Sequence, residues 1–167
     1  MKKILGCLVA LAIASGTVAA QEAAAPPAAA PPATHVFVKA ADIKWGDPPP
    51  VFKKGALFAV ISGDPSKEGL FVIRAKLPAG YKVMPHFHPT DEHVTVITGT
   101  FALGMGDTFD AKTMTKLPAG AYALLPATMH HYAMATTATT IQVHGMGPFA
   151  LTYVNPADDP SAAPAAK

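Results

Sequence analysis

The chain has little cysteine and little net charge, and each shortage excludes a class of function. Its single cysteine is Cys7, inside an N-terminal apolar stretch. If that stretch is removed, the protein has no thiol and no disulfide, which excludes cysteine chemistry. Removing Lys2 and Lys3 from the 13 basic residues makes them equal in number to the 11 acidic residues. A neutral surface without basic clusters argues against nucleic acid and anionic membrane as partners.

Long helical patterns and membrane-spanning runs are also missing. After residue 20, no stretch repeats apolar residues at the helical period. The apolar run over residues 4–13 is too short to cross a bilayer. It follows Lys2 and Lys3 and precedes the small residues Val18-Ala19-Ala20, which is typical of a secretory signal. We therefore expect a signal peptide over residues 1–20, a periplasmic or secreted protein, and no membrane partner once the signal is removed.

The rest of the chain divides by composition. Residues 21–34 are almost wholly alanine and proline, which is typical of an extended linker. Residues 157–167 end in a similar composition and are expected to form a flexible tail. One domain is therefore predicted over residues 35–156.

Short β-like runs separated by glycine- and proline-containing turns fill this domain. Many short strands at hairpin spacing predict an all-β sandwich or barrel. The tetrapeptide Leu-Pro-Ala-Gly occurs at 77–80 and again at 117–120, which we interpret as one turn used twice. The expected strands are residues 35–40, 57–61, 70–76, 82–88, 93–98, 100–103, 121–125, 131–135, 139–144 and 149–154.

The stretch GYKVMPHFHPTDEHVTVITG, residues 80–99, contains the most informative group of side chains. His86 and His88 are two residues apart, so in a strand both side chains project from the same face. Glu92 follows four residues later. Imidazole nitrogens with one carboxylate form a mixed donor set that suits a divalent first-row metal. A second stretch, GAYALLPATMHH at 120–131, supplies a further histidine.

The spacing of the first stretch resembles the first conserved motif of the cupin superfamily at each of its five positions: Gly80, His86, His88, Glu92 and Gly99. The second stretch is similar to the second cupin motif at Gly120, Pro126 and His131. It departs from that motif at Thr128, where glycine is usual, and at Ala135, where asparagine is usual. The amino-acid sequences of residues 88–107 and 142–160 also resemble those of small exported single-domain cupins of proteobacteria.

This resemblance implies an antiparallel double-stranded β-helix, or jelly-roll barrel, with one divalent transition metal in its mouth. The resemblance does not distinguish among iron, manganese, zinc, nickel and copper as this metal. The implied ligands are His86, His88, Glu92 and His131. If the turn needs a positive φ at residue 128, a threonine there raises the conformational free energy of the turn.

Strand alternation separates the remaining histidines from this set. Of His130 and His131, only one can face the metal, and the step from Pro126 favours His131. His93 follows Glu92 and is expected to point the other way. His144 forms an alternating pair with Gln142 that could line the cavity. It is therefore a candidate catalytic proton carrier, with a hydrogen-bonded structural role as the alternative. Glu92 is a second catalytic candidate, as a base.

Three functions remain open from the sequence. The first is a metal-dependent enzyme that acts on a small molecule, of oxygenase, decarboxylase or isomerase type, with a dioxygenase-like reaction foremost. The second is a non-catalytic module of the cell envelope that binds a metal or a small ligand. The third is a structural barrel with an empty site. Strands that are apolar on both faces, such as residues 121–125, make a homodimer plausible.

Overall fold

Residues 35–162 are described by the computed structural model. The predicted signal peptide (1–20), the predicted linker (21–34) and the end of the predicted tail (163–167) lie outside the described residues. Within them, no helix is long and apolar enough to cross a membrane. The strands are β1 (Leu57–Ser62), β2 (Gly69–Leu77), β3 (Lys82–Phe87), β4 (Glu92–Thr98), β5 (Thr100–Met105), β6 (Thr115–Pro118), β7 (Tyr122–Leu125), β8 (His131–Ala135), β9 (Thr139–Gly147) and β10 (Thr152–Tyr153), with short 3-10 helices at Ala40–Asp42 and Pro156–Asp158.

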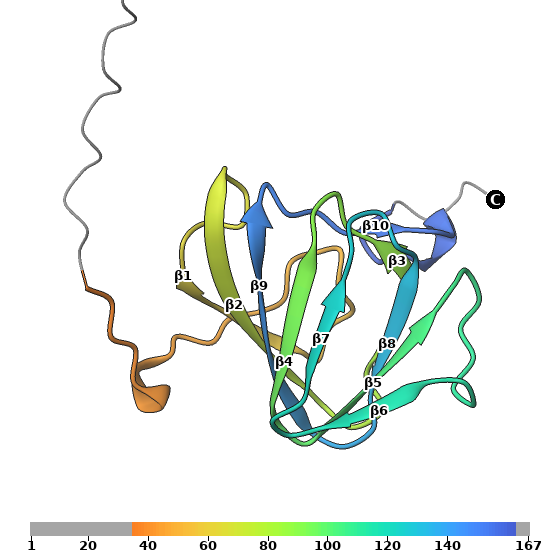
Figure 1. Ribbon diagram of the computed structural model, residues 1–167, viewed down its shortest axis with the longest axis horizontal. Coiled ribbons are helices and arrows are strands. Elements are labelled where there is room, and N and C mark those ends of the chain that lie inside the picture. Colours follow the sequence, from red (N-terminus) through yellow and green to blue (C-terminus); the bar gives the residue numbers. More distant parts are fainter. Residues whose placement is uncertain (1–34, 163–167) are drawn as a thin grey trace, which may run out of the picture. The chain divides into compact units, whose positions relative to one another are not determined.

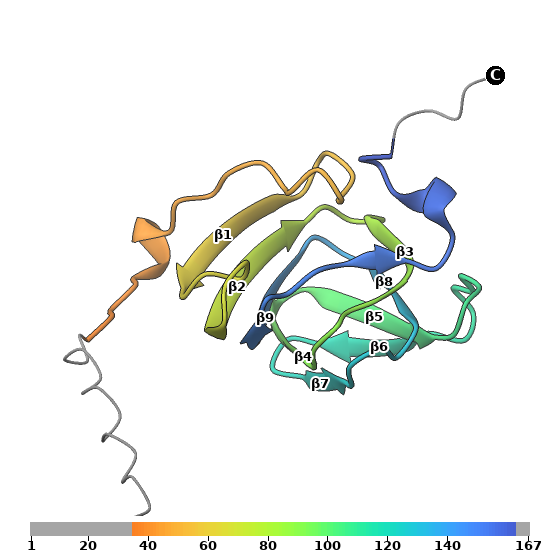
Figure 2. The same ribbon diagram turned by 90° about the horizontal axis from the view of Figure 1, so that it is seen from above.

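These strands form two five-stranded antiparallel sheets. One has the order β1-β2-β9-β4-β7 and the other has the order β10-β3-β8-β5-β6. Figures 1 and 2 show the two sheets facing each other, with strands distant in sequence placed side by side. The prediction of an all-β jelly-roll barrel is confirmed.

Side-chain alternation along the strands builds the interior. On β9, Ile141 and Val143 are buried and line the inside, whereas Gln142 and His144 take the intervening, less buried positions. On β4, Val94 and Val96 are each 1% exposed. Strands of both sheets thus contribute alternate apolar residues to one core.

The repeated Leu-Pro-Ala-Gly sequence forms the same turn twice, as predicted. The amide of Tyr81 donates to the carbonyl of Pro78, and the amide of Ala121 donates to the carbonyl of Pro118. The glycines of the two turns have φ values of 81° and 88°, in the left-handed region that glycine adopts without a Cβ clash. The first turn leads into β3, which contains His86, and the second leads into β7, which precedes His131.

Thr128 also lies in the left-handed region, with a φ of 63°, alone among the non-glycine residues described. Its position in the second motif is usually glycine, and a β-branched residue is strained at positive φ. Its amide nevertheless donates a 2.8 Å hydrogen bond to the carbonyl of His88. The turn therefore keeps its conformation and connects the two histidine-containing stretches.

The N-terminal strand expected at residues 35–40 is wrong. Residues 35–39 have no strand partner among the described residues, and Val36 and Phe37 are 61% and 90% exposed. Alternation alone does not supply a neighbouring strand to pair with. The chain first joins the sheet at Gly46, which exchanges two backbone hydrogen bonds of 2.9 Å with Phe58 on β1. Figure 2 shows the segment before β1 running along this edge strand.

Candidate metal centre

Four polar side chains predicted from the two motifs come from three different strands and one loop. His86 lies near the end of β3, and His88 follows just after it. Glu92 begins β4 and His131 begins β8. In the β3–β8 pair, His86 and His131 are direct cross-strand partners, so backbone pairing alone places these two rings together.

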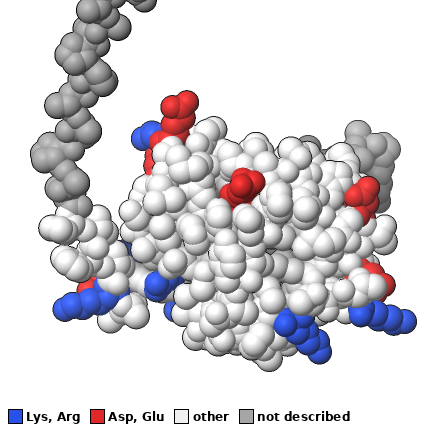
Figure 3. All heavy atoms as spheres, in the orientation of Figure 1, with Lys and Arg blue, Asp and Glu red and all other residues white. Residues whose placement is uncertain are grey.

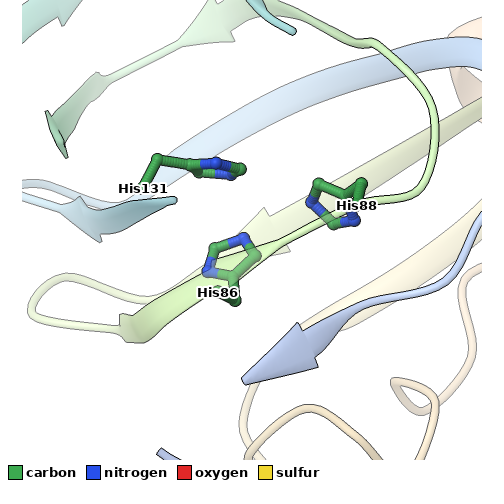
Figure 4. Close-up of side chains that lie close together, drawn as sticks. All are labelled: His86, His88 and His131. Carbon is green, nitrogen blue, oxygen red and sulfur yellow. The ribbon is translucent and has the colours of Figure 1, made fainter. Parts of the chain in front are cut away.

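The three histidines converge on one point inside the barrel. One ring nitrogen from each of His86, His88 and His131 lies within 4.8 Å of those of the other two. The residues are 4%, 4% and 1% exposed. Figure 4 shows the three rings turned toward one another from β3, the segment after it and β8. Such a group could hold a metal ion.

Backbone carbonyls fix the orientation of all three rings. Nδ1 of His86 lies 2.7 Å from the carbonyl oxygen of Met84. Nδ1 of His88 lies 2.7 Å from that of Ala150, and Nδ1 of His131 lies 2.9 Å from that of Met129. A carbonyl can only accept, so each Nδ1 must carry the proton. Each neutral ring is then left with a bare lone pair on Nε2, which is the nitrogen a metal requires.

The Glu92 carboxylate completes the group on one side. Its Oε2 lies 3.5 Å from Nε2 of His88 and 3.3 Å from Nε2 of His131. Both nitrogens are buried without a hydrogen-bond partner. Buried polar atoms of this kind are rare and need an explanation. A cation between these atoms would satisfy them together, so the donor set fits a metal.

Burial and the neighbouring rings keep His86 neutral. Burial first, and then the neighbouring His131 and His88 rings, lower the pKa of His86 from 6.5 to about 3. For Glu92, burial acts to raise the pKa, but positive charge at the contacts with His131 and then His88 outweighs it and holds the pKa below its usual range. With both Nε2 atoms unprotonated, that charge has to come from a cation bound between them. A carboxylate with a lowered pKa is a weak base. The electrostatics therefore favour Glu92 as a ligand over Glu92 as a proton acceptor.

Apolar side chains form the wall around these groups. The Phe149 ring stacks on His88 with a centroid distance of 4.2 Å and an interplanar angle of 18°. The cavity that contains the three histidines and Glu92, called the cup below, has a volume of about 60 Å³. Sequence reasoning did not assign Phe149 or the Ala150 carbonyl to the site. Both lie in a stretch that resembles exported cupins, but outside the two motifs.

His144 does not face the cup, so the idea that it lines the cavity with Gln142 is wrong. Ile141 and Val143 take the inward positions of β9. His144 stacks on His93, its cross-strand partner, with a centroid distance of 4.8 Å. The oxygen of Gln142 accepts a 3.0 Å hydrogen bond from Arg74. A proton carrier at the three histidines would need another residue.

Two further histidines, His93 and His130, also lie outside the cup. The Nδ1 atom of His93 is 2.7 Å from the hydroxyl of Tyr122. The Nδ1 atom of His130 is 2.6 Å from Oδ1 of Asp107, and its ring stacks on Phe87. Strand alternation thus separates each pair of sequence neighbours, Glu92 from His93 and His131 from His130.

Residues 14–152 match a family described as a domain of unknown function, DUF4437. The match covers most of the chain, including both motifs. The chain belongs to this family. None of the curated proteins matches it.

Solved structures show that this DUF4437 chain has the cupin fold. The polyketide cyclase RemF from Streptomyces resistomycificus has a TM-score of 0.62 and 16% identity, with 77% of this chain and 91% of that chain covered. A candidate acetylacetone dioxygenase from Methylibium petroleiphilum has a TM-score of 0.60 and 20% identity, with 79% and 89% covered. An RmlC-like cupin from Shewanella frigidimarina has a TM-score of 0.53 and 15% identity, with 68% and 91% covered. The resemblance to cupins is confirmed in the fold, and identities this low carry no function.

Proposed function

We propose that this protein binds one divalent transition metal through His86, His88, Glu92 and His131, and uses it as an enzyme on a small molecule. The single observation that supports the ligand set is the pair of buried, unpartnered Nε2 atoms on His88 and His131. They lie beside the Glu92 carboxylate, and backbone carbonyls hold the opposite nitrogens of both rings.

Three imidazoles and one carboxylate leave a divalent ion with a net charge near +1. Such a metal would accept further ligands, such as water, dioxygen or a chelating substrate. When bound, the metal supplies Lewis acidity or a site for dioxygen, which suits an oxygenase, decarboxylase or isomerase reaction. We place the dioxygenase-like reaction first.

The protein's own residues supply position and environment. The carbonyls of Met84, Ala150 and Met129 hold the three rings in one tautomer, so little reorganisation accompanies binding. The Phe149 ring covers one face of His88 and keeps water from that side. A buried apolar wall strengthens every charge interaction inside it.

A non-catalytic binding module is the second candidate, and the size of the cup favours it. A volume of about 60 Å³ has room for an ion and a few water molecules, since one water needs roughly 10–15 Å³. A sequestering protein needs no more space. An enzyme needs access for its substrate from a neighbouring space.

The partners and the location that we propose follow from the chain's surface and its N-terminus. In the orientation of Figure 3, charged side chains are few and scattered, which agrees with a small-molecule ligand rather than nucleic acid. The sequence of residues 1–20 supports export to the periplasm or beyond. A homodimer is the oligomeric state that we propose to test first.

Metal analysis of protein produced with its own N-terminal sequence and recovered from the periplasm tests the site. We expect close to one transition-metal ion per chain, and loss of that ion in His88→Ala with the far-ultraviolet circular dichroism unchanged. Full metal retention in His88→Ala contradicts the ligand set. Oxygen uptake and substrate-loss assays on the loaded protein then separate the enzyme from the binding module.

A further inference from the structure

A large groove lies beside the cup, between the segment before β1 and the edge of the first sheet. Residues 46–51 form one side of it, and β1, β2 and the loop after β9 form the other. We call it the side groove. Its volume is about 660 Å³, within the range of roughly 300–1,000 Å³ that small-molecule sites occupy.

The side groove and the cup share part of their walls. Five apolar side chains line both spaces: Phe52, Phe58, Ile73, Phe149 and Leu151. Phe52 and Phe58 contact each other with ring centroids 4.8 Å apart. Phe149 lies on His88 at the other end of this partition. A molecule held in the side groove is therefore separated from the three histidines only by aromatic and aliphatic side chains.

These shared side chains are only partly buried. A partly buried ring has open space on one side and can change rotamer without forcing the core apart. The fully buried residues of the barrel, such as Phe71 at 0% exposure, do not have this freedom. The partition is thus the part of the cup wall that can yield to a ligand.

The chemistry of the side groove selects what it can hold. Its wall is made of apolar side chains and prolines, and its charged side chains, Lys44 and Asp47, are exposed and of opposite sign. An anionic ligand such as a phosphate finds no excess of positive charge there. An uncharged ring finds three phenylalanine faces, which favour offset or edge-on stacking.

Resting on the metal site proposed above, we propose that the side groove binds the ring-bearing apolar body of the substrate, whose oxygen-bearing head passes the phenylalanine partition to reach the three histidines. The size of the cup requires this division, because its volume of about 60 Å³ has room for a polar head but not for a ring system. The substrate class is a small, neutral, ring-bearing molecule with a metal-chelating oxygen group at one end.

Two chelators with the same head test the division on zinc-loaded protein. Acetohydroxamate carries only a methyl group on the chelating head, and benzohydroxamate carries a phenyl ring in its place. Burying one ring predicts that benzohydroxamate binds about tenfold to a hundredfold more tightly by isothermal titration calorimetry. Trp45 is the only tryptophan and lies between two residues that line the groove. Its fluorescence should change with benzohydroxamate and not with acetohydroxamate.

A matched pair of exposed positions separates the groove from the rest of the surface. Val60 on β1 lines the side groove and is 59% exposed, whereas Leu70 on β2 is 62% exposed and does not line it. Val60→Glu should bring the two affinities within about threefold of each other, without changing acetohydroxamate binding. Leu70→Glu should leave the ratio as in the wild type.

Each outcome decides one of the two proposals. If both chelators bind the wild type equally, or if Val60→Glu leaves the ratio unchanged, the side groove is not the site of the apolar body and the metal site stands. If neither chelator binds the zinc-loaded protein, the bound metal has no position open to a substrate, and the proposed enzyme is overturned together with the groove proposal.

Discussion

Two groups of histidines lie on the two different sheets, one inside the cup and one outside it, and they differ in burial, ring orientation and hydrogen-bond partners. The inner group is His86, His88 and His131, which are nearly inaccessible to solvent. The outer pair is His93 and His144, cross-strand partners on β4 and β9. Glu92 and His93 are consecutive, yet they belong to different groups.

The rings of the two groups have different mutual orientations. The inner rings are inclined to one another by 80°, 62° and 41°, and one nitrogen of each ring lies within 4.8 Å of those of the other two. The outer rings are almost parallel, with an interplanar angle of 14°, so corresponding lone pairs do not converge.

The contacts of the second ring nitrogen differ as well. Each inner Nδ1 is held by a carbonyl, which fixes the tautomer. The outer Nδ1 of His93 contacts the hydroxyl of Tyr122, which can donate or accept, and the Nδ1 of His144 has no partner. Proximity of two histidines is therefore not sufficient for a metal site. The fixed tautomer and the shared focus make the inner group a candidate metal site.

The strongest test of the difference in metal binding between the two groups is to remove one histidine from each. His131→Ala should lower metal affinity by at least about a hundredfold, because even groups that only orient a ligand are worth about 10–100-fold. His144→Ala should leave metal affinity unchanged. Competition against a chelator of known affinity measures both. Equal losses in the two variants contradict the separation of the groups.

The pH dependence of the free energy of unfolding should also arise from the inner group. The pKa of His86 falls from 6.5 to about 3 on folding, first because of burial and then because of its two neighbours. Below pH 6.5 the unfolded chain therefore binds a proton that the folded metal-free protein does not. The free energy of unfolding is then fully retained above that pH and falls by at most about 1.4 kcal/mol per pH unit as the pH decreases toward 3.

Urea denaturation of metal-free protein between about pH 7 and pH 5 measures this slope. His86→Gln should flatten it, because the titrating group is removed. His144→Gln, in the outer pair, serves as the control and should keep most of the slope. A wild-type slope in His86→Gln assigns the pH dependence to other groups.

A smaller effect on metal affinity is expected from the aromatic side chains that contact the two groups, which are Phe149 at the inner group and Tyr122 at the outer pair. Phe149→Ala removes the ring stacked on His88 and opens one side of the cup to water, which should weaken metal binding about tenfold. Tyr122→Phe removes the hydroxyl that contacts His93 and should not change metal binding. Calorimetric titration with zinc compares the two. The comparison fails if Tyr122→Phe has the larger effect.

The smallest effect concerns the backbone next to the inner group. Thr128 has a φ of 63°, and Thr128→Gly should relieve strain and raise the free energy of unfolding by up to about 1 kcal/mol. Thr128→Ala keeps a Cβ at positive φ and should give a smaller gain. Urea midpoints at constant pH measure the difference. A lower stability in Thr128→Gly shows that the threonine side chain stabilises the turn.

Most of the site was predictable because its residues obey local rules. Two histidines at an interval of two on a strand share a face whatever the rest of the chain does, and the spacing to Glu92 and the resemblance to cupins pointed to the same side chains. The strand at residues 35–40 failed for the opposite reason. Alternation describes which way side chains face, but a strand also needs a neighbouring backbone to pair with, and this segment has none among the described residues.

Composition and strand period are local properties, so the residues alone were enough to predict the all-β class and the four candidate donors. Long-range packing was needed to turn Ile141 and Val143, rather than Gln142 and His144, toward the cup, because sheet pairing sets the face on which each alternating series lies. It also brought the Ala150 carbonyl to His88 and the side groove to the cup's wall. Those contacts join segments about sixty or more residues apart, and no local pattern records them.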